Sequence, residues 1–346
     1  MEKSLFLVNK SVKEAIAYME EKDIKALVIV DEERKIKGLF SHGDMRRYFL
    51  KGGELSANIQ NAMNAEPIVF SNRQEAEQRR REKPLVIYPI INEERVVIDI
   101  LFERESIENE QVSSILSTVP LVIMAGGKGT RLFPYTKILP KALIPIGDYT
   151  IMERIIKVFE RYGCNKVFTV INYKGNMIKA YFNELDKDYS MDFVEETEFL
   201  GTGGGLSLLK GMIDNTFFLS NCDILVNADL ECVYKTHKMN GNKITIVCAM
   251  KNMQIPYGIV ETNDEGGIQD FKEKPEFSFL TNTGLYLIEP EVIDSLNEGE
   301  FVHFPDIAKR YLERGEKVGV FPIPESAWMD MGQFKEMDVM MKTLGV

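Results

Sequence analysis

The chain has 346 residues, of which 45% are hydrophobic and 27% charged, and its formal net charge is −11 at pH 7. This length suits two domains of about 150 residues each, and the acidic balance argues against nucleic-acid binding, which needs clustered lysine and arginine. The four cysteines show neither metal-ligand nor disulfide spacing, no apolar run approaches the ~18 residues of a membrane span, and the N-terminus lacks a signal-peptide layout, so we expect a cytoplasmic protein without membrane partners.

The first hundred residues contain a weak internal repeat. Residues 31–40 and 92–101 each read as strand, polar turn and strand, at an offset of 61 residues (from 31 to 92). Before the first copy, a helix is predicted to open at Ser11, where Glu14 completes a capping box. The apolar stripe of this helix is predicted to consist of Val12, Ala15, Ile16 and Met19.

This layout resembles a pair of CBS motifs, small units that come in twos and often bind adenine nucleotides. The resemblance implies that Ser41 and Asp44 of the first copy hold a ribose. The second copy has FERE at residues 102–105 and lacks the hydroxyl, so we expect one regulatory adenine-nucleotide site per chain. A docking or dimerisation module without a ligand is the alternative. We expect this regulatory domain to cover residues 1–112.

A second domain is expected over residues 113–346, with a polar linker at 106–119. From residue 119 strand and helix patterns alternate, which predicts an α/β fold with a Rossmann-like mixed sheet. Thr150 and Glu153 form another capping box and open a helix with one apolar side. Strands of the mixed sheet are predicted at 121–124, 166–171, 217–219, 244–250, 258–261 and 284–288.

The first of these strands runs directly into the sequence MAGGKGTRL. Glycines in such a turn let the backbone approach a ligand, and the freed N–H groups point at anionic oxygens. Arg131 adds a rigid positive fork that suits phosphate, and a second cation, Lys141, follows in the sequence PKALIP. A glycine-rich turn without a ligand is the alternative for the glycines alone.

Together, these two motifs resemble the signature of sugar-1-phosphate nucleotidyltransferases, which make nucleotide sugars from a sugar phosphate and an NTP. The resemblance implies an α/β domain of the nucleotide-diphospho-sugar transferase type, preceded by a small α+β CBS pair. It also implies that Arg131 and Lys141 stabilise the triphosphate and the charge that develops at its α-phosphorus. The nucleotide contacts that it implies for the first loop are Ala125, Gly126, Gly127, Gly129 and Thr130.

A second glycine-rich turn, EETEFLGTGGGL, begins at residue 195. In the family this loop covers the base, which implies contacts from Gly201 and Thr202 and places Glu196 at the base edge. A carboxylate accepts hydrogen bonds from N1–H and N2–H₂ of guanine, so we favour GTP over UTP or dTTP. A solvated acidic edge is the alternative reading of these acids.

Two aspartates are candidate metal ligands. Asp223 follows a predicted strand, at the sheet edge where open α/β sheets bind ligands, and Asp330 lies in the sequence WMDMG. Both contexts resemble family patterns that hold Mg²⁺, and magnesium prefers one or two carboxylates together with substrate oxygens. The resemblance therefore implies Mg²⁺ as the cofactor and a catalytic role for Asp223.

Three later motifs, PYGIV, FKEKP and TNTGLY, match the sugar pocket of the family. They imply that Tyr257, Gly258 and Asn282 line this pocket, that Glu273 binds sugar hydroxyls and that Lys274 binds the sugar phosphate. We therefore predict a homo-oligomeric enzyme similar to mannose-1-phosphate guanylyltransferases. A uridylyl- or thymidylyltransferase of the same fold and a non-catalytic nucleotide-sensing homologue are the alternatives.

Overall fold

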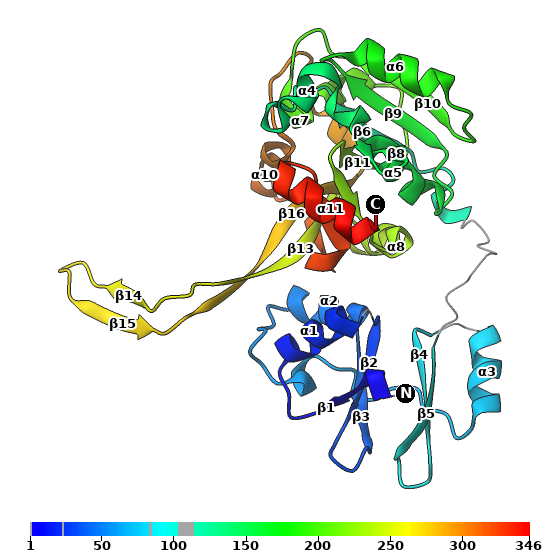
Figure 1. Cartoon of the computed structure of the whole chain (residues 1–346), viewed down its shortest axis with the longest axis vertical. Coiled ribbons are helices and arrows are strands. Elements are labelled where there is room, and N and C mark those ends of the chain that lie inside the picture. Colours follow the sequence, from blue (N-terminus) through cyan, green and yellow to red (C-terminus); the bar gives the residue numbers. More distant parts are fainter. Residues whose placement is uncertain (1, 23, 83–84, 103–113) are drawn as a thin grey trace. The chain divides into compact units, whose positions relative to one another are not determined.

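The computed structural model describes residues 2–22, 24–82, 85–102 and 114–346 (Figure 1). The chain divides into two compact units, Met1–Asn109 and Glu110–Val346. Within the described ranges, no helix combines the length and the apolar character needed to cross a bilayer.

The first unit contains two groups of paired strands with helices beside them (Figure 1). Strands β1, β2 and β3 form a three-stranded sheet, and β4 pairs antiparallel with β5. In chain order the elements are η1 (Glu2–Ser4), β1 (Leu5–Leu7), α1 (Val12–Lys22), β2 (Ala26–Val30), β3 (Ile36–Ser41), α2 (His42–Leu50), η2 (Ile59–Asn61), α3 (Arg73–Glu82), β4 (Ile87–Ile91) and β5 (Val97–Phe102), where η denotes a 3₁₀-helix.

The predicted repeat is confirmed by the two hairpins. Arg34 and Arg95, one at each hairpin turn and 61 positions apart (from 34 to 95), both have left-handed backbone conformations with φ of 62° and 64°. The hairpins also bond to each other reciprocally: Ile36 N–H donates to the Arg95 carbonyl and Val97 N–H donates to the Arg34 carbonyl, each at 3.0 Å. Equivalent residues of the two copies thus occupy equivalent positions.

Helix α1 begins as predicted. The backbone N–H of Glu14 donates to Ser11 Oγ at 3.2 Å, and the backbone N–H of Ser11 donates to the Glu14 carboxylate at 2.9 Å. This reciprocal pair satisfies two donors that a helix start leaves without partners, and such a cap typically contributes about 1 kcal/mol. The four predicted stripe residues Val12, Ala15, Ile16 and Met19 are buried.

The second unit carries a seven-stranded mixed sheet in the order β10-β9-β6-β11-β16-β13-β17. Its elements as far as residue 221 are η3 (Ser114–Leu116), β6 (Leu121–Ala125), η4 (Thr130–Leu132), α4 (Tyr135–Ile138), η5 (Lys141–Leu143), β7 (Pro145–Ile146), β8 (Tyr149–Thr150), α5 (Ile151–Glu160), β9 (Lys166–Ile171), α6 (Gly175–Glu184), β10 (Ser190–Glu195), α7 (Gly201–Gly204), η6 (Gly205–Leu209) and β11 (Phe217–Asn221). The later elements are β12 (Ile224–Val226), α8 (Leu230–Asn240), β13 (Ile244–Gln254), β14 (Ile259–Thr262), β15 (Ile268–Lys272), β16 (Glu276–Ile288), α9 (Glu291–Asp294), α10 (Phe304–Glu313), β17 (Val318–Pro324), η7 (Glu325–Ala327), β18 (Trp328–Asp330) and α11 (Phe334–Leu344).

The strands of the first half of this sheet are parallel, and β16 is antiparallel to both β11 and β13. The predicted mixed α/β sheet is therefore confirmed. One strand was assigned wrongly: the segment predicted at 258–261 corresponds to β14, which pairs with β15 in a separate hairpin. The reason is that β13 and β16 continue past the sheet as a two-stranded ribbon, which carries β14 and β15 away from it (Figure 1).

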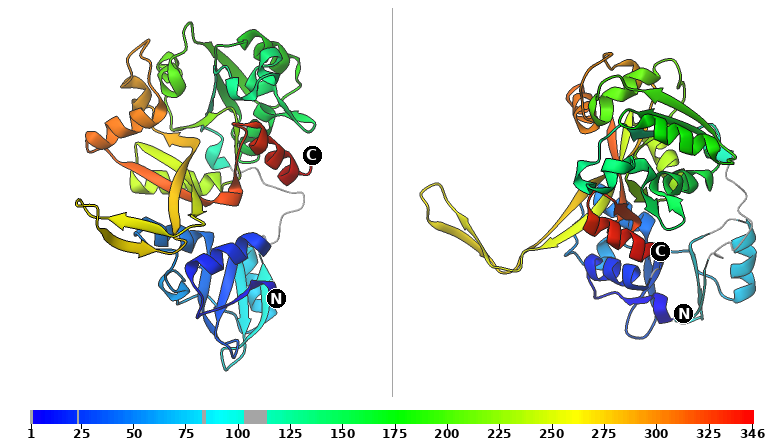
Figure 2. Two further views of the ribbon diagram at one scale, coloured as in Figure 1. Left: turned by 60° about the vertical axis from the view of Figure 1, so that its left-hand side comes forward. Right: turned by 45° about the horizontal axis from the view of Figure 1, so that its top comes forward.

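Both faces of the sheet are covered, as Figure 2 shows for the helices on either side. All five residues of β6 are buried, because alternate side chains contribute to the two hydrophobic cores on opposite faces. Helix α5 begins at the predicted capping box, in which Glu153 N–H donates to Thr150 Oγ1 at 3.2 Å. Leu116 and Val119 also belong to the core, so the described end of the predicted 106–119 linker is packed structure; residues 106–113 lie outside the described ranges.

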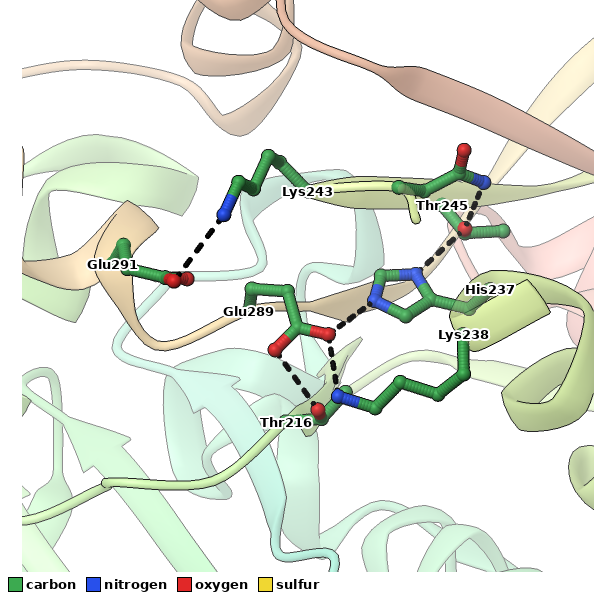
Figure 3. A network of polar contacts seen from close by, with 8 residues as sticks. Thr216, His237, Lys238, Lys243, Thr245, Glu289 and Glu291 are labelled. Atoms are coloured by element: carbon green, nitrogen blue, oxygen red, sulfur yellow. Dashed lines mark hydrogen bonds and ion pairs between the residues drawn. The ribbon is translucent and has the colours of Figure 1, made fainter. Parts of the chain in front are cut away.

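A buried polar network ties together four chain segments at one edge of this sheet (Figure 3). His237 of α8 is fully buried, with Nδ1 2.8 Å from Thr245 Oγ1 of β13 and Nε2 3.0 Å from the Glu289 carboxylate just after β16. Lys238 Nζ and Thr216 Oγ1, just before β11, donate to the same carboxylate at 2.6 and 3.0 Å. Burial raises the pKa of Glu289, but these hydrogen bonds outweigh it and lower the pKa to about 2. The network lies where β11 begins, and the opposite edge, where β11 ends, carries the candidate site.

Candidate active site

A cavity of about 260 Å³ opens at the carboxyl ends of β6 and β11. This is the sheet edge at which open α/β folds bind ligands. Segments separated by up to a hundred positions contribute to its wall, all of them between residues 124 and 223. The predicted site residues that line it are Gly126, Gly127, Gly129, Thr130, Arg131, Lys141, Glu196, Gly201, Thr202 and Asp223. The structure thus brings together the predicted phosphate and base residues and one predicted metal ligand, Asp223, whereas Ala125 and Asp330 are not part of the lining.

The first loop leaves β6 in a conformation that exposes its backbone to the cavity. Ala125 is buried at the end of the strand, whereas Gly127 and Thr130 are exposed. Gly129 has φ of 60°, a left-handed conformation that favours glycine, and its carbonyl accepts a hydrogen bond from Thr136 Oγ1 at 2.8 Å. Arg131 is exposed at the cavity rim, where its guanidinium is free to meet an anionic ligand.

Lys141 and Asp223 line the cavity together, and Asp330 lies on the strand that pairs beside Asp223. Lys141 Nζ donates to the Asp223 carboxylate, a contact between residues 82 positions apart. Strand β12 pairs with β18 so that Ile224 lies opposite Asp330, which sets the two aspartates on neighbouring chain segments. Burial raises the pKa of Asp330, and the negative charge of Asp223 raises it further while Lys141 opposes the rise. Two neighbouring carboxylates, Asp223 and Asp330, fit a divalent cation, which would reduce the repulsion between their negative charges.

Glu196 is a buried acid at the cavity wall. Its side chain is only 6% exposed, and among the described residues Oε1 has no hydrogen-bond partner. Burial raises the pKa of this carboxyl to about 7, although a hydrogen bond from the Leu200 backbone lowers it somewhat. Glycines make room for the carboxyl, because a Cβ would lie 2.5 Å from Oε2 at Gly126 and 2.4 Å from Oε1 at Gly205. A carboxyl oxygen without a hydrogen-bond partner at a cavity wall is suited to a ligand with hydrogen-bond donors.

The predicted sugar residues lie elsewhere. Tyr257, Gly258, Glu273 and Lys274 are on the ribbon of residues 251–281, here called the arm, which runs away from the rest of the unit (Figure 1). All four are exposed, and the hairpin places Gly258 opposite Glu273, whose carboxylate would be 2.9 Å from a Cβ at this glycine. Asn282, at the base of the arm, donates to Tyr286 Oη at 2.7 Å. The structure therefore places the four arm residues away from the cavity, whereas Asn282 accepts a hydrogen bond from Gly284 N–H, and Gly284 packs against the cavity residue Asn221.

Four residues that line the cavity were not predicted from the sequence, namely Met124, Phe199, Asn221 and Cys222. Phe199, half-exposed at 47%, lines the cavity, and its ring meets that of Phe301 edge-on, with ring centroids 6.0 Å apart. Asn221 lies two positions before Asp223 and packs against Gly284 of β16. Phe199 and Asn221 each stand two positions from a predicted residue, and Met124 and Cys222 each adjoin one. Proximity to a predicted site residue was therefore the available signal.

The first unit holds the other predicted ligand site. Asp44 is buried, and with Ser41 it forms a capping box at the start of α2: Ser41 Oγ donates to Asp44 Oδ2 at 2.5 Å, and Ser41 N–H donates to it at 2.9 Å. Arg47 Nη2 donates to Asp44 Oδ1 at 2.5 Å. The side chains of Ser41 and Asp44 therefore already have hydrogen-bond partners within the protein, and a ribose bound here would have to displace or share these hydrogen bonds. Residues 103–105 of the second copy lie outside the described ranges.

Comparisons with known proteins agree with this architecture. The family described as Nucleotidyl transferase matches residues 121–344, and the CBS domain matches residues 1–51. The crystal structure of HddC from Yersinia pseudotuberculosis complexed with GMP-PN shares the fold, with a TM-score of 0.52 and 19% sequence identity over 65% of this chain and 99% of that one.

Two curated relatives are similar to the second unit. The UTP–glucose-1-phosphate uridylyltransferase of Synechocystis is 32% identical over 52% of this chain and 51% of its own length. The mannose-1-phosphate guanyltransferase of Pichia angusta is 32% identical over 62% of this chain and 61% of its own length. The chain thus matches about half to three-fifths of the length of these relatives.

Proposed function

Because this chain belongs to the nucleotidyl transferase family, we propose that it is a sugar-1-phosphate nucleotidyltransferase that forms an NDP-sugar and pyrophosphate from an NTP and a sugar-1-phosphate. The observation that carries the proposal is the convergence of the glycine-rich loop, Arg131, Lys141, Asp223 and Glu196 on one cavity. These residues supply the charge neutralisation and positioning that phosphoryl chemistry needs. The proposed division of the chain is a CBS pair at 1–112 and the transferase at 113–346.

In the proposed reaction, an oxygen of the sugar phosphate forms a bond to the α-phosphorus of the NTP. The bond between the α-phosphorus and the bridging oxygen to the β-phosphorus breaks, and pyrophosphate leaves with the electron pair. Backbone N–H groups of the loop at 126–130 bind the triphosphate, and Arg131 clamps it with two parallel hydrogen bonds. Lys141 neutralises the negative charge that grows around the α-phosphorus as the leaving group departs.

Asp223 and Asp330 would hold Mg²⁺. Their adjacent carboxylates, with a raised pKa at Asp330, fit a divalent cation that takes its remaining ligands from substrate phosphates. When bound, the ion supplies Lewis-acid stabilisation of phosphate oxygens. Lys141, already paired with Asp223, would then turn toward the phosphates.

We propose GTP as the preferred nucleotide. The unpartnered Oε1 of Glu196 supports this, because N1–H and N2–H₂ of guanine offer two donors to one carboxylate. Gly201 and Thr202 line the same side of the cavity and would contribute backbone contacts to the base. The uridylyl and thymidylyl alternatives remain outcomes of the test below.

For the sugar, we propose Tyr257, Gly258, Glu273, Lys274 and Asn282. A glutamate suits sugar hydroxyls and a lysine suits the sugar phosphate, and Gly258 and Glu273 already lie together on the arm. We further propose that the protein is a cytoplasmic homo-oligomer.

For the first unit we propose that Ser41 and Asp44 bind the ribose of one regulatory adenine nucleotide per chain. An adenine nucleotide that binds there can regulate the enzyme only as far as it binds two conformations differently. A dimerisation module without a ligand is the alternative.

The test is a pyrophosphate-release screen of GTP, UTP, dTTP, ATP and CTP against a panel of sugar-1-phosphates, with the Asp223→Asn variant as the inactive control. We expect turnover that depends on Mg²⁺, with GTP giving the highest kcat/KM. A tenfold advantage for UTP or dTTP would overturn the choice of nucleotide. Nucleotide binding without pyrophosphate release from any pair of substrates would overturn the catalytic assignment and favour the non-catalytic nucleotide-sensing homologue.

A further inference from the structure

The two cations that are proposed to act on the nucleotide lie at the ends of one largely exposed segment. Residues 131–141 carry Arg131 at one end and Lys141 at the other, and between them α4 is a single turn of four residues. Phe133, Tyr135 and Ile138 are exposed by 41%, 52% and 74%. A turn this short is not stable as an isolated helix, so contacts with the rest of the fold have to fix its position.

Lys174, at the start of α6, supplies such a contact. Its ammonium donates to the carbonyls of Lys137 and Ile138 at 2.5 and 2.8 Å and lies 3.5 Å from the carbonyl of Thr136. These are the last three carbonyls of α4, of the kind that a helix leaves without partners inside itself and that a nearby lysine can satisfy. One side chain, 36 to 38 positions away in the chain, thus binds the end of α4.

The local backbone does not explain why a lysine occupies position 174. Its φ is 55°, a left-handed conformation that residues other than glycine rarely adopt, because their Cβ comes too close to the following carbonyl oxygen. Lys174 is also the residue that caps α6, yet its side chain makes no capping hydrogen bond to that helix. The bonds to the end of α4 are therefore the contribution that distinguishes a lysine from a glycine at this position.

The end of α4 is coupled directly to the residues beside the two cations. Thr136 Oγ1 donates to the Gly129 carbonyl at 2.8 Å, so α4 is bonded to the residue two positions before Arg131. A Cβ at Gly129 would lie 3.0 Å from Thr136 Cγ2 and 3.2 Å from the Cβ of Lys141, so these three residues pack closely. A displacement of α4 would therefore shift the backbone next to Arg131 and the stem of Lys141 together.

We propose that Lys174 is a positioning residue, which holds the end of α4 and thereby keeps Arg131 and Lys141 in place for the α-phosphate of the nucleotide. This inference rests on the proposed function. Lys174 lines a neighbouring cavity and not the one of about 260 Å³, so it acts through the two cations and not on the substrate. Groups that stabilise transition-state charge lose much of their effect when they shift by about 1 Å, so loss of this contact lowers mainly kcat.

Steady-state kinetics of three substitutions at position 174 test this role. Lys174→Met keeps a long side chain but removes the ammonium, and it should lower kcat by about 10- to 100-fold while KM for the nucleotide changes by about threefold at most. Lys174→Arg keeps a cation with several donors and should restore most of the lost kcat. Lys174→Gly suits the left-handed backbone, so it should have a higher Tm than Lys174→Met but no higher kcat. Recovery of kcat in Lys174→Gly would show a merely structural role and overturn the proposal.

Lys187→Met is the matched control. Lys187 Nζ donates to the Phe182 carbonyl at 2.6 Å, so this substitution removes the same kind of lysine–carbonyl bond at the opposite end of α6 from Lys174. Its kcat should stay within about twofold of wild type. An equal loss in Lys187→Met, or full activity of Lys174→Met, would overturn the proposal and leave the proposed function standing. An inactive wild type would instead overturn the proposed function.

Two further measurements distinguish positioning from an independent contribution. Hydrogen exchange followed by mass spectrometry should be faster in peptide 133–141 of Lys174→Met than in wild type, and unchanged in the peptide that contains α5. Lys174→Met combined with Arg131→Ala should lower kcat by less than the product of the two single losses, because Lys174 acts partly through Arg131. Unchanged exchange at 133–141, or losses that multiply fully, would overturn the proposal.

Discussion

Replacement of Glu196 by Gln should stabilise the protein at alkaline pH while it damages GTP selection. The carboxyl of Glu196 is buried between glycines, and burial raises its pKa from 4.5 to about 7. Above pH 7 the folded protein must hold a desolvated negative charge that the unfolded chain exposes to water. Gln has nearly the same shape and no charge, so the variant avoids this cost.

The magnitude follows from linkage. The pKa of Glu196 is about 7 in the folded protein and 4.5 in the unfolded chain, so folding takes up a proton between these two pH values. The free-energy cost of burying the ionised carboxyl therefore grows as the pH rises from 4.5 to 7. With 1.36 kcal/mol per pKa unit, the cost reaches about 3 kcal/mol at pH 8.5 and is about 1 kcal/mol at pH 5.5. Glu196→Gln should therefore raise the free energy of unfolding by these amounts, or the Tm by roughly 6–12 °C at pH 8.5.

Urea unfolding of wild type and variant at pH 5.5 and 8.5 measures the effect, with Glu198→Gln as the control on the same loop, where Glu198 is exposed. A gain in stability that does not grow by about 2 kcal/mol between the two pH values would refute the buried-carboxylate reasoning. In the same variant, the ratio of kcat/KM for GTP to that for UTP should fall, because an amide offers guanine one acceptor and a competing donor. An unchanged ratio would show that Glu196 does not contact the base.

The remaining predictions concern other groups. Asp223→Asn and Asp330→Asn should leave the unfolding transition intact but remove most Mg²⁺-dependent turnover, and near-wild-type rates at saturating Mg²⁺ would exclude a metal role. Arg131→Lys should lower kcat by about 10²–10³, because a point charge cannot replace the bidentate fork; a change of only a few-fold would place Arg131 away from the reacting phosphates. Glu289→Gln should lower the free energy of unfolding by about 3 kcal/mol above pH 5. This loss should vanish as the pH falls from 4.5 through about 2, because the lowered pKa of Glu289 stabilises the fold only while the carboxyl is ionised. A loss that does not depend on pH in urea unfolding would contradict this reasoning. In calorimetric titration with AMP, ADP and ATP, wild type should bind one adenine nucleotide per chain and Asp44→Ala none, whereas identical binding would refute the proposed ribose site.

Local features were readable from the sequence. The capping boxes at Ser11 and Thr150 join groups three positions apart, so their hydrogen bonds depend on little beyond the chain next to them. The burial of β6 follows from its unbroken apolar run, which only a strand covered on both faces can hide. The hairpin repeat follows from two matching polar turns, DEER at 31–34 and NEER at 92–95, each followed by an apolar run.

The tertiary structure decided what depends on distant segments. The sequence indicated Lys141 and Asp223 as separate candidates, but only the packing of β6 beside β11 pairs them across 82 positions. Burial raises the pKa of Glu196, and this burial includes close approach to Gly126, which lies far away in the chain. The apolar and polar side chains of the segment at 258–261 alternate as in a strand of the main sheet. Such alternation predicts a half-buried strand but does not identify the strand with which it pairs. Its pairing in the arm, and the placement of the PYGIV and FKEKP motifs on the arm, follow from long-range register between β13 and β16, which no local pattern encodes.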